Sequence, residues 1–351
     1  MNDFEFQARR ARLEPLFDSA RSLADASTER GQRARELIVA SSGLSPQGVE
    51  FALQRCLESS PPEAEISALI RSTPSAQVAH VLLSANVFVA AHRAIAIGLA
   101  ASERVRVRAS RREPAMAELL LAGAPNSFQL VGELSPHAGD RLWAYGSDET
   151  MDEVAVTLPP GVALHAHGAG FGVAVMDGSV SESEWAELLP ALAEDIALFD
   201  QRGCLSPRVL LVNAEPPFVG EVARRLAHEL ATLERRVPRG QLTALELSEI
   251  ARYRDTAHFT GEVLEAGLGF VTLGPADRWL LPPTGRNIHV VPSRDALSAL
   301  TPHRPLLTSC AFAGKTALGQ ALSRAIPGAR SCRFGQMQRP PFDGPVDRRE
   351  I

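Results

Sequence analysis

The first 75 residues carry apolar positions at helical spacing. Leu13 and Phe17 lie four residues apart, and further apolar residues continue the same helical face. Ser45 precedes a proline and a new set of apolar positions, so we expect it to cap the start of another helix. A Pro-Pro pair then separates off a short helix predicted for 64–71. The sequence therefore predicts a helical region over residues 1–75.

From residue 78 onward, short apolar runs alternate with longer amphipathic or alanine-rich segments. The short runs are typical of strands buried in a parallel sheet, and the longer segments are typical of the helices that cover it. The predicted strands are 78–84, 105–109, 142–145, 163–167, 171–176, 209–212 and 288–291. The predicted helices are 88–102, 182–199, 219–233 and 314–325. This order predicts an α/β fold that begins with a strand–helix–strand unit.

Composition narrows the class of protein but not its activity. The chain has 351 residues, of which 45% are hydrophobic and 22% charged, and this suits a globular protein of two domains. A net charge of −5 argues against nucleic acid as a partner. No stretch has the apolar length of a membrane span, and the charged start lacks the apolar run of a signal peptide. The four cysteines form no CxxC pair, so we expect a reduced, cytoplasmic protein.

The segment Asp200–Pro207 holds the strongest candidate for chemistry. A helix is expected to end near Phe199, a glycine precedes Cys204, and a strand follows, so Cys204 is expected in a tight turn. Backbone amides can approach a thiol in such a turn, and Arg202 is a nearby cation that would lower the pKa of the thiol. Because a single cysteine in a loop is more often structural than catalytic, these residues alone leave both interpretations open.

The same segment, DQRGCLSPRVLLV, resembles the nucleophile segment of the aldehyde dehydrogenase superfamily. It is still more similar to the acyl-CoA reductase branch of the LuxC type, where the pattern Asp-Gln-x-x-Cys-x-Ser-Pro is expected. The resemblance implies an aldehyde-dehydrogenase-like α/β fold with a Rossmann-type cofactor domain and an α/β catalytic domain. The expected parts are a helical N-terminal region (1–75), an NAD(P)-binding domain (76–185), a catalytic domain with the Cys nucleophile (186–325) and an extended C-terminal strap (326–351).

The resemblance also implies roles for residues near two strand ends. Asn86 corresponds to the family's oxyanion donor, which acts together with the backbone N–H of Cys204. The alternative for this asparagine is a helix N-cap in a strand-to-helix turn. Arg108, Ser110 and Arg111 lie where the family binds the adenosine ribose, so we expect them to contact the cofactor.

Two further features concern the cofactor. Gly146 and Ser147 follow a strand and resemble the family's turn near the pyrophosphate and nicotinamide, so both are predicted cofactor contacts. The arginines at the ribose position suit a 2′-phosphate, because a guanidinium group binds phosphate through two donors. We therefore predict NADPH, with NADH as the alternative. A solvated basic strand end would explain the same arginines without any cofactor.

The departures from the family pattern are also informative. Where the dehydrogenases have a Glu that activates water, the stretch Leu164–Gly170 holds no carboxylate. A reductase that starts from a thioester needs no such water, so His167, or else His165, is the predicted proton donor. Both histidines lie on one strand face, but no third metal ligand is evident and we expect no metal. The family's Glu-x-Phe segment is absent as well, and 282–285 stands in its place.

The sequence thus predicts an NAD(P)H-dependent reductase that converts an acyl-CoA or acyl-carrier-protein thioester into an aldehyde through a Cys204 acyl-enzyme. By the resemblance, we expect a homo-oligomer. Two alternatives stay open. One is another enzyme on the same fold, such as an aldehyde dehydrogenase or an acyl-phosphate reductase. The other is a non-catalytic paralogue that acts as a binding subunit.

Overall fold

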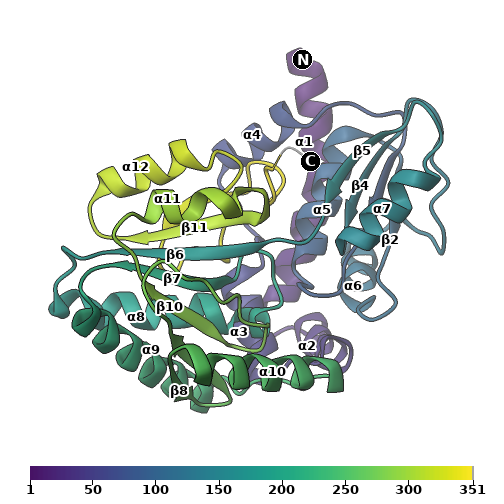
Figure 1. The fold of residues 1–351 in the computed structure, drawn as a ribbon. Coiled ribbons are helices and arrows are strands. Elements are labelled where there is room, and N and C mark those ends of the chain that lie inside the picture. Colours follow the sequence, from purple (N-terminus) through teal and green to yellow (C-terminus); the bar gives the residue numbers. More distant parts are fainter. Residues whose placement is uncertain (350–351) are drawn as a thin grey trace.

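Two β-sheets organise the chain, and helices pack against each of them. The computed structural model describes residues 1–349, and Figure 1 shows the smaller sheet beside the larger one. All paired strands are parallel except for one hairpin, β8–β9. The predicted α/β fold is therefore confirmed. Across residues 1–349, no helix combines the length and the apolar character needed to cross a membrane.

The first sheet has the strand order β3-β2-β1-β4-β5. Its elements are β1 (Ala79–Leu82), α5 (Ala90–Ala101), β2 (Val105–Arg108), α6 (Ala115–Gly123), β3 (Gln129–Leu130), β4 (Arg141–Tyr145), α7 (Asp148–Thr157) and β5 (Ala163–His167). The predicted strand–helix–strand unit is confirmed as β1–α5–β2. The strand order reverses between β1 and β4, and at such a point a parallel sheet opens a crevice at the carboxyl ends of its strands.

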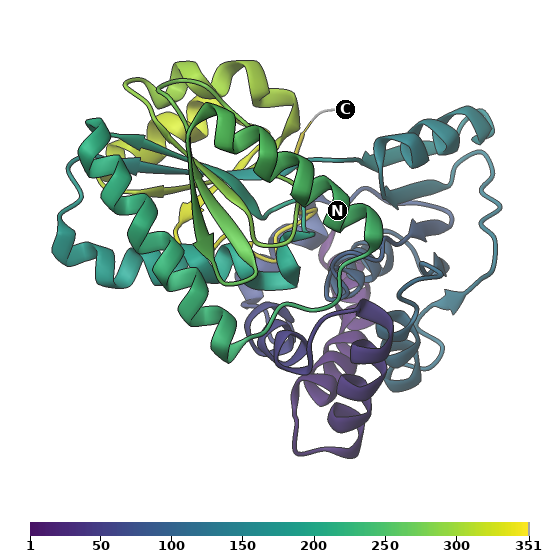
Figure 2. The same cartoon turned by 60° about the horizontal axis from the view of Figure 1, so that its bottom comes forward.

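Four helices precede the first sheet and share its core. They are α1 (Asp3–Ala24), α2 (Glu29–Ser42), α3 (Pro46–Cys56) and α4 (Glu63–Ser72). The predicted apolar face is buried, since Leu13 and Phe17 lie in one core cluster with Ile95 of α5. Ser45 caps α3 as predicted, because its side chain accepts the N–H of Gly48 at 3.0 Å. In Figure 2 these purple helices lie against the blue elements of the first sheet.

The second sheet has the strand order β12-β11-β6-β7-β10-β9-β8. Its elements are β6 (Phe171–Asp177), α8 (Glu182–Ala197), β7 (Pro207–Asn213), α9 (Pro216–Arg236), α10 (Ala244–Thr260), β8 (Glu262–Ala266), β9 (Gly269–Leu273), β10 (Ile288–Pro292), α11 (Ala296–Leu300), β11 (Leu307–Ala313), α12 (Thr316–Ala325) and β12 (Arg330–Arg333). Alternate residues of β7 face two cores: Leu210 packs with α8 and α9, whereas Leu211 packs with α11 and α12.

The second sheet begins earlier in the chain than the expected boundary at residue 185. Strand β6 pairs with β7 and β11, so the change of sheet lies between His167 and Phe171. Residue 185 itself falls inside α8. The sequence pattern did not reveal this, because β5 and β6 are two short strands only three residues apart. A strand shows the same pattern whichever sheet it joins.

Several elements were not predicted at all. They are β3, α6, α7, α10, the β8–β9 hairpin, α11, β11 and β12. Strand β11 reads LTSCAFA, and its polar residues hide the apolar run that marks a buried strand. Thr308 and Ser309 are nevertheless buried there, because their hydroxyl groups donate to backbone oxygens of the segment that contains Cys204.

The C-terminal segment after β12 crosses from the second sheet to the first. Arg93 of α5 donates to the carbonyl oxygens of Pro341 at 2.6 Å and Gly344 at 2.9 Å. Phe342 is only 1% exposed and packs against Phe17 with a centroid distance of 5.6 Å. The segment is therefore not only an extended strap, because its aromatic residue enters the core of the first sheet. Residues 350–351 of the expected strap lie outside the described residues.

His92 makes the stability of this core depend on pH. It is fully buried beside Phe342, neither ring nitrogen has a hydrogen-bond partner within residues 1–349, and burial lowers its pKa to about 3. Once unfolded, its pKa is near 6.5, so acid favours the unfolded chain. We expect the contribution of His92 to the free energy of unfolding to fall by about 1.4 kcal/mol per pH unit below pH 6.5.

The variant His92→Phe removes this proton uptake and keeps an aromatic ring in the core. Denaturant unfolding at pH 7 and pH 5 is expected to show a weaker loss of stability than in the wild type. The variant His228→Gln changes an exposed histidine and is expected to keep the wild-type pH dependence. An equally steep loss in His92→Phe would contradict the assignment.

Candidate active site

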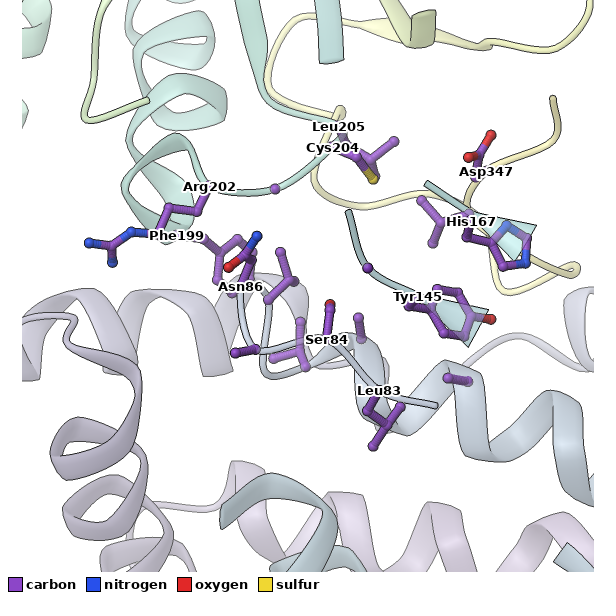
Figure 3. A pocket seen from close by; sticks show the side chains of 18 of the residues that line it. Leu83, Ser84, Asn86, Tyr145, His167, Phe199, Arg202, Cys204, Leu205 and Asp347 are labelled. Carbon is purple, nitrogen blue, oxygen red and sulfur yellow. The ribbon is translucent and has the colours of Figure 1, made fainter. Parts of the chain in front are cut away.

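A cleft of about 540 Å³ lies between the two sheets, at the carboxyl ends of β1, β4 and β5 (Figure 3). The predicted site residues that line it are Cys204, Asn86, His167, Ser110, Gly146 and Ser147. Arg108, at the end of β2, and the exposed Arg111 are not among its lining residues. The fold thus collects the proposed catalytic residues from three segments that lie far apart in the sequence.

Cys204 lies in the turn between the 3₁₀ segment Leu198–Gln201 and β7. Phe199, Asp200 and Gln201 have φ angles of 55°, 50° and 67°, so three consecutive residues are left-handed. An L-residue in this conformation costs about 1–2 kcal/mol, and none of the three is glycine. The helix end near Phe199 and the strand after Cys204 agree with the sequence prediction, whereas the left-handed course between them was not foreseen.

The residues that follow the thiol are held by neighbouring strands of the second sheet. Thr308 of β11 donates to the carbonyl oxygen of Cys204, and Ser309 donates to that of Leu205 at 2.9 Å. A side chain on Gly172 of β6 would collide with the carbonyl oxygen of Leu205. The backbone around the cysteine is therefore fixed by bonds that only the folded sheet can supply.

The segment Arg333–Pro341, which received no role from the sequence, supports the same turn. Gln338 lines the cleft, and its side chain donates to Oγ of Ser206 at 2.9 Å. The segment is anchored by Asp195 of α8, whose carboxylate accepts the N–H of Gly335 at 2.6 Å. The same carboxylate also accepts the N–H of Met337 at 3.1 Å. Burial raises the pKa of Asp195 to about 7, although the hydrogen bonds from these N–H groups oppose the shift.

The thiol of Cys204 is desolvated, and burial raises its pKa to about 11. The negative charge of Asp347 raises this pKa further. Arg349 opposes the shift, and so do the adjacent backbone N–H groups of Cys204 and Leu205. The side chain is consequently a thiol at neutral pH, and it needs a proton acceptor to become a nucleophile.

Arg202 does not activate the thiol, contrary to the sequence prediction. Its guanidinium donates to the carboxylate of Glu246 at 2.9 Å and to the carbonyl oxygen of Gln241 at 2.8 Å. Figure 3 shows the side chain pointing away from the sulfur of Cys204. The prediction was wrong because proximity in sequence does not reveal on which side of a turn a long side chain lies.

Asn86 follows β1 and faces the cleft. It is not the N-cap of the next helix, because α5 begins after Val89 and has no side-chain cap. Its amide oxygen accepts a hydrogen bond from Nη2 of Arg112 at 3.2 Å. This bond turns the oxygen toward the arginine and leaves the NH₂ group as the donor available to a ligand.

His167 is the last residue of β5, and its ring stacks on Tyr145 at 4.6 Å. Its Nε2 atom is buried and has no hydrogen-bond partner among the described residues. Burial lowers its pKa to about 4, an effect that the charge of Asp347 partly offsets, so the imidazole is neutral at pH 7. His165 stacks on Trp143 instead and is not among the residues that line the cleft.

The C-terminal segment brings into the cleft a carboxylate that was not predicted from the sequence. Asp347 lines the cleft, is 5% exposed and accepts the guanidinium of Arg349 at 2.6 and 2.9 Å. Arg349 in turn donates to the carbonyl oxygen of Ala169 at 2.9 Å, beside β5. Only the charged composition of the tail hinted at such a role, because nothing in its pattern shows where the tail lies.

The carboxyl ends of the first sheet form the other wall of the cleft. Ser110 follows β2, and Gly146 and Ser147 follow β4, so they flank the point where the strand order reverses. Ser147 caps α7 by accepting the N–H of Thr150 at 3.3 Å. The first turn of α7 carries two carboxylates, one of which, on Asp148, accepts the N–H of Ala169. This helix end is thus already compensated by negative charge.

Comparison with known proteins gives one family and one fold. Residues 124–347 match the family model described as acyl-CoA reductase (LuxC), which is well over half of the chain. The chain belongs to the LuxC acyl-CoA reductase family. This is a family of oxidoreductases that act on acyl groups, and the membership confirms the resemblance found in the sequence. No curated protein gives a significant match to the chain.

Several solved structures, an aldehyde dehydrogenase among them, share the fold of this LuxC-family chain. An oxidoreductase from Marinobacter aquaeolei superposes with a TM-score of 0.74 at 12% identity, over 95% of this chain and 79% of that one. PnpE from Pseudomonas sp. WBC-3 gives a TM-score of 0.71 at 13% identity, over 94% and 78%. The NAD-dependent benzaldehyde dehydrogenase from Corynebacterium glutamicum gives 0.68 at 14%, over 93% and 80%. The predicted aldehyde-dehydrogenase-like fold is confirmed.

The charges of Asp347 and Arg349 act on Cys204 in opposite directions, which gives a paired prediction. Asp347→Asn removes a charge that raises the pKa of the thiol, so alkylation of Cys204 by iodoacetamide at pH 8 should become several-fold faster. Arg349→Gln removes a charge that lowers it, so alkylation should become slower. The rates are measured by peptide mass spectrometry between pH 7 and pH 10. A change of both variants in the same direction would indicate general loosening of the tail instead.

Proposed function

We propose that this protein reduces an acyl thioester, carried by CoA or by an acyl-carrier protein, to an aldehyde with a reduced nicotinamide cofactor. The observation that carries the proposal is the cleft itself. It joins a thiol, a side-chain amide donor and an imidazole whose Nε2 has no partner among residues 1–349 to the carboxyl ends of a sheet with Rossmann strand order. Membership of the LuxC family supports the thioester as substrate.

In the proposed reaction Cys204 is the nucleophile. Neutral His167 accepts the thiol proton, the sulfur attacks the carbonyl carbon, and the C–S bond to the carrier breaks. The leaving thiolate takes up the proton from His167. The NH₂ group of Asn86 and the backbone N–H of Cys204 hold the negative charge on the carbonyl oxygen. After reduction of the acyl-enzyme, its thiohemiacetal releases the aldehyde and regenerates the thiol.

The first sheet fits a dinucleotide, because its strand order 3-2-1-4-5 places a crevice between β1 and β4. The bound cofactor would supply a hydride to the acyl carbon. Gly146 would permit close approach beside Ser147, and Ser110 would line the same side. The structure of PnpE, which shares this fold, has been solved with nicotinamide adenine dinucleotide, and this supports a nicotinamide cofactor for the present chain. The carboxylates at the start of α7 favour a phosphate position nearer β2.

We propose NADPH in preference to NADH, because Arg108 and Arg111 lie around the end of β2 and their side chains make no hydrogen bond or ion pair within residues 1–349. Such guanidinium groups suit a 2′-phosphate. The two cofactors are compared by initial rates with one acyl-CoA. Arg108→Gln and Arg111→Gln are expected to raise the KM for NADPH several-fold and to leave that for NADH nearly unchanged. Equal effects on both cofactors would contradict the phosphate role.

A second candidate function is aldehyde oxidation, which the carboxylate of Asp347 in the cleft favours. Oxidation requires a base that activates water for hydrolysis of the acyl-enzyme. Both carboxylate oxygens of Asp347 accept hydrogen bonds from the guanidinium of Arg349, however, so neither is free to take a proton from water. We therefore place reduction first. Aldehyde-dependent formation of the reduced cofactor, lost in Asp347→Asn, would reverse this order.

The acyl-enzyme gives the most direct test of the proposal. Purified protein incubated with acyl-CoAs of increasing chain length is expected to gain the mass of one acyl group, and Cys204→Ala is expected to gain none. Addition of NADPH should discharge the adduct, with aldehyde as the product. An unmodified wild-type protein across CoA and carrier-protein thioesters would rule out the proposed reaction.

Asn86 provides a test of the oxyanion site. Asn86→Ala is expected to slow acylation about 100-fold, because one donor to a developing oxyanion is worth about 10²–10³ in rate. Arg112→Gln keeps the donor but loses the bond that orients it, so a smaller decrease is expected. Single-turnover acylation followed by mass spectrometry measures both. A rate for Asn86→Ala within threefold of the wild type, a margin well below the effect of an oxyanion donor, would exclude the role.

A further inference from the structure

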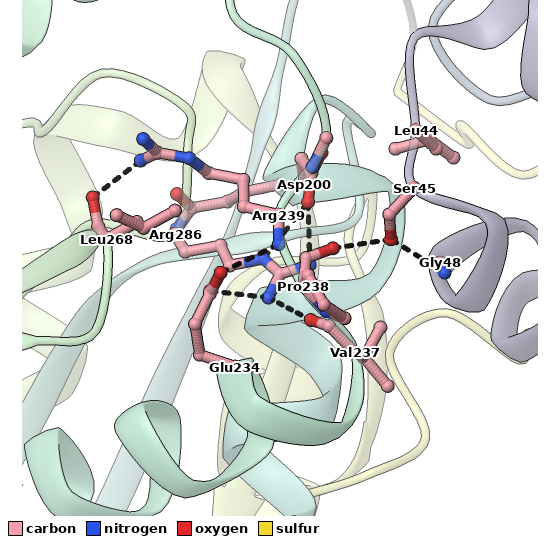
Figure 4. A network of polar contacts seen from close by, with 12 residues as sticks. Leu44, Ser45, Gly48, Asp200, Glu234, Val237, Pro238, Arg239, Leu268 and Arg286 are labelled. Carbon is pink, nitrogen blue, oxygen red and sulfur yellow. Dashed lines mark hydrogen bonds and ion pairs between the residues drawn. The ribbon is translucent and has the colours of Figure 1, made fainter.

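The left-handed turn at Phe199–Gln201 is gripped by a buried ion pair from a distant part of the chain (Figure 4). Oδ1 of Asp200 accepts Nη2 of Arg286 at 2.8 Å and Nε at 3.0 Å. Asp200 is 1% exposed and Arg286 is 3% exposed. Two charged donors that meet at one oxygen fix the position of that oxygen, and with it they restrain the backbone of Asp200.

The arginine is itself held from the other side. Its Nη1 donates to the carboxylate of Glu234 at 2.8 Å and to the carbonyl oxygen of Val237 at 2.6 Å, at the end of α9. Oδ2 of Asp200 accepts the backbone N–H of Gly240 at 2.9 Å. The carboxylate and the guanidinium each therefore have partners beyond one another, so the turn is tied to helix α9 as well as to the start of β10.

Gln201 forms a second attachment, which is uncharged. Its Nε2 donates to the carbonyl oxygens of Asn287 and Pro207, both at 2.7 Å, and its Oε1 accepts the backbone N–H of Asn287 at 2.8 Å. Gln201 and Asn287 are almost fully buried. Two adjacent residues of the turn, Asp200 and Gln201, thus bind two adjacent residues, Arg286 and Asn287, that lead into β10.

These contacts hold the turn in a left-handed conformation that its residues would not otherwise keep. Left-handed L-residues are unfavourable, and such strain persists where the surroundings over-determine it. Cys204 follows the turn by three residues, so the position of its backbone N–H depends on the course of the turn. The ion pair makes no contact with the cleft, since neither Asp200 nor Arg286 lines it. Its effect on the thiol can only pass through the backbone of the turn.

We propose that Arg286 is a positioning residue for Cys204. It holds the left-handed turn in the conformation that aims the backbone N–H of Cys204, together with its thiol, at a bound carbonyl group. Asn287 has the same role through Gln201. The inference rests on the proposed role of Cys204 as nucleophile, but not on the identity of the acyl carrier or of the cofactor.

The test compares two reactions of the same sulfur. In acetylation by p-nitrophenyl acetate, an S–C bond forms, the bond to p-nitrophenolate breaks, and the carbonyl oxygen carries negative charge on the way. Alkylation by iodoacetamide displaces iodide and develops no oxyanion. Arg286→Met is expected to slow acetylation of Cys204 at least tenfold, and alkylation less than threefold, because only acetylation needs the aimed N–H. Rates are measured by peptide mass spectrometry on protein shown to be folded by circular dichroism.

Two further variants separate positioning from general stability. Arg35→Gln breaks another partly buried arginine–carboxylate pair, with Glu50; neither residue lines the cleft or binds the turn, so this variant is expected to keep the wild-type ratio of acetylation to alkylation. Arg286→Met combined with Asp200→Gly removes both charges and places glycine where φ is 50°. This double variant is expected to recover most of the lost acetylation, because glycine adopts the left-handed conformation without the Asp200–Arg286 ion pair.

If Arg286→Met does not fold, Gln201→Ala, which leaves the ion pair intact, is expected to give the same selective loss of acetylation. An unchanged ratio in a folded Arg286→Met or Gln201→Ala variant, or the same loss in Arg35→Gln, would overturn the inference. Failure of the proposed function is a separate result: acyl-CoA would then leave the wild type unmodified, while p-nitrophenyl acetate still acetylates Cys204 and the variants still differ from it.

Discussion

The buried pair of Asp200 and Arg286 is the interaction on which the geometry of the cleft depends. A buried ion pair adds little net stability, because desolvation of both charges offsets their attraction. Its specificity is the more useful property, since Arg286 holds one carboxylate oxygen with two donors while the N–H of Gly240 holds the other, and together they fix the orientation of the carboxylate. Here that orientation fixes a turn that three non-glycine residues would not adopt on their own. The strand after Cys204 then begins in a defined place.

The cysteine is held from both sides, and each side uses a different part of the second sheet. Before it, the segment that leads into β10 grips the turn. After it, the hydroxyl groups of Thr308 and Ser309 on β11 bind the backbone oxygens. The sheet order β11-β6-β7-β10 places these partners around the start of β7. A parallel sheet thus supplies a rigid frame for one short turn.

Desolvation in the cleft keeps both reactive groups neutral. Burial raises the pKa of Cys204 and lowers that of His167, because each charged form loses its water. The C-terminal segment adds Asp347 and Arg349, a pair of nearly cancelling charges, at the edge of the same cleft. This segment also packs Phe342 into the core of the first sheet. The same stretch of chain therefore connects the two sheets and places charges beside the reactive groups.

The sequence alone determined the α/β class, the helical start and the segment around Cys204, because these depend on local periodicity and on a short, specific pattern. It also identified Asn86 and His167, which the fold brings to the cleft. Tertiary structure decided the rest. No local pattern tells which sheet β6 joins, that Arg202 points away from the thiol, or that Arg286 reaches back to Asp200. These features depend on contacts between residues far apart in the chain. Such contacts form only when the chain has folded and the two sheets have assembled.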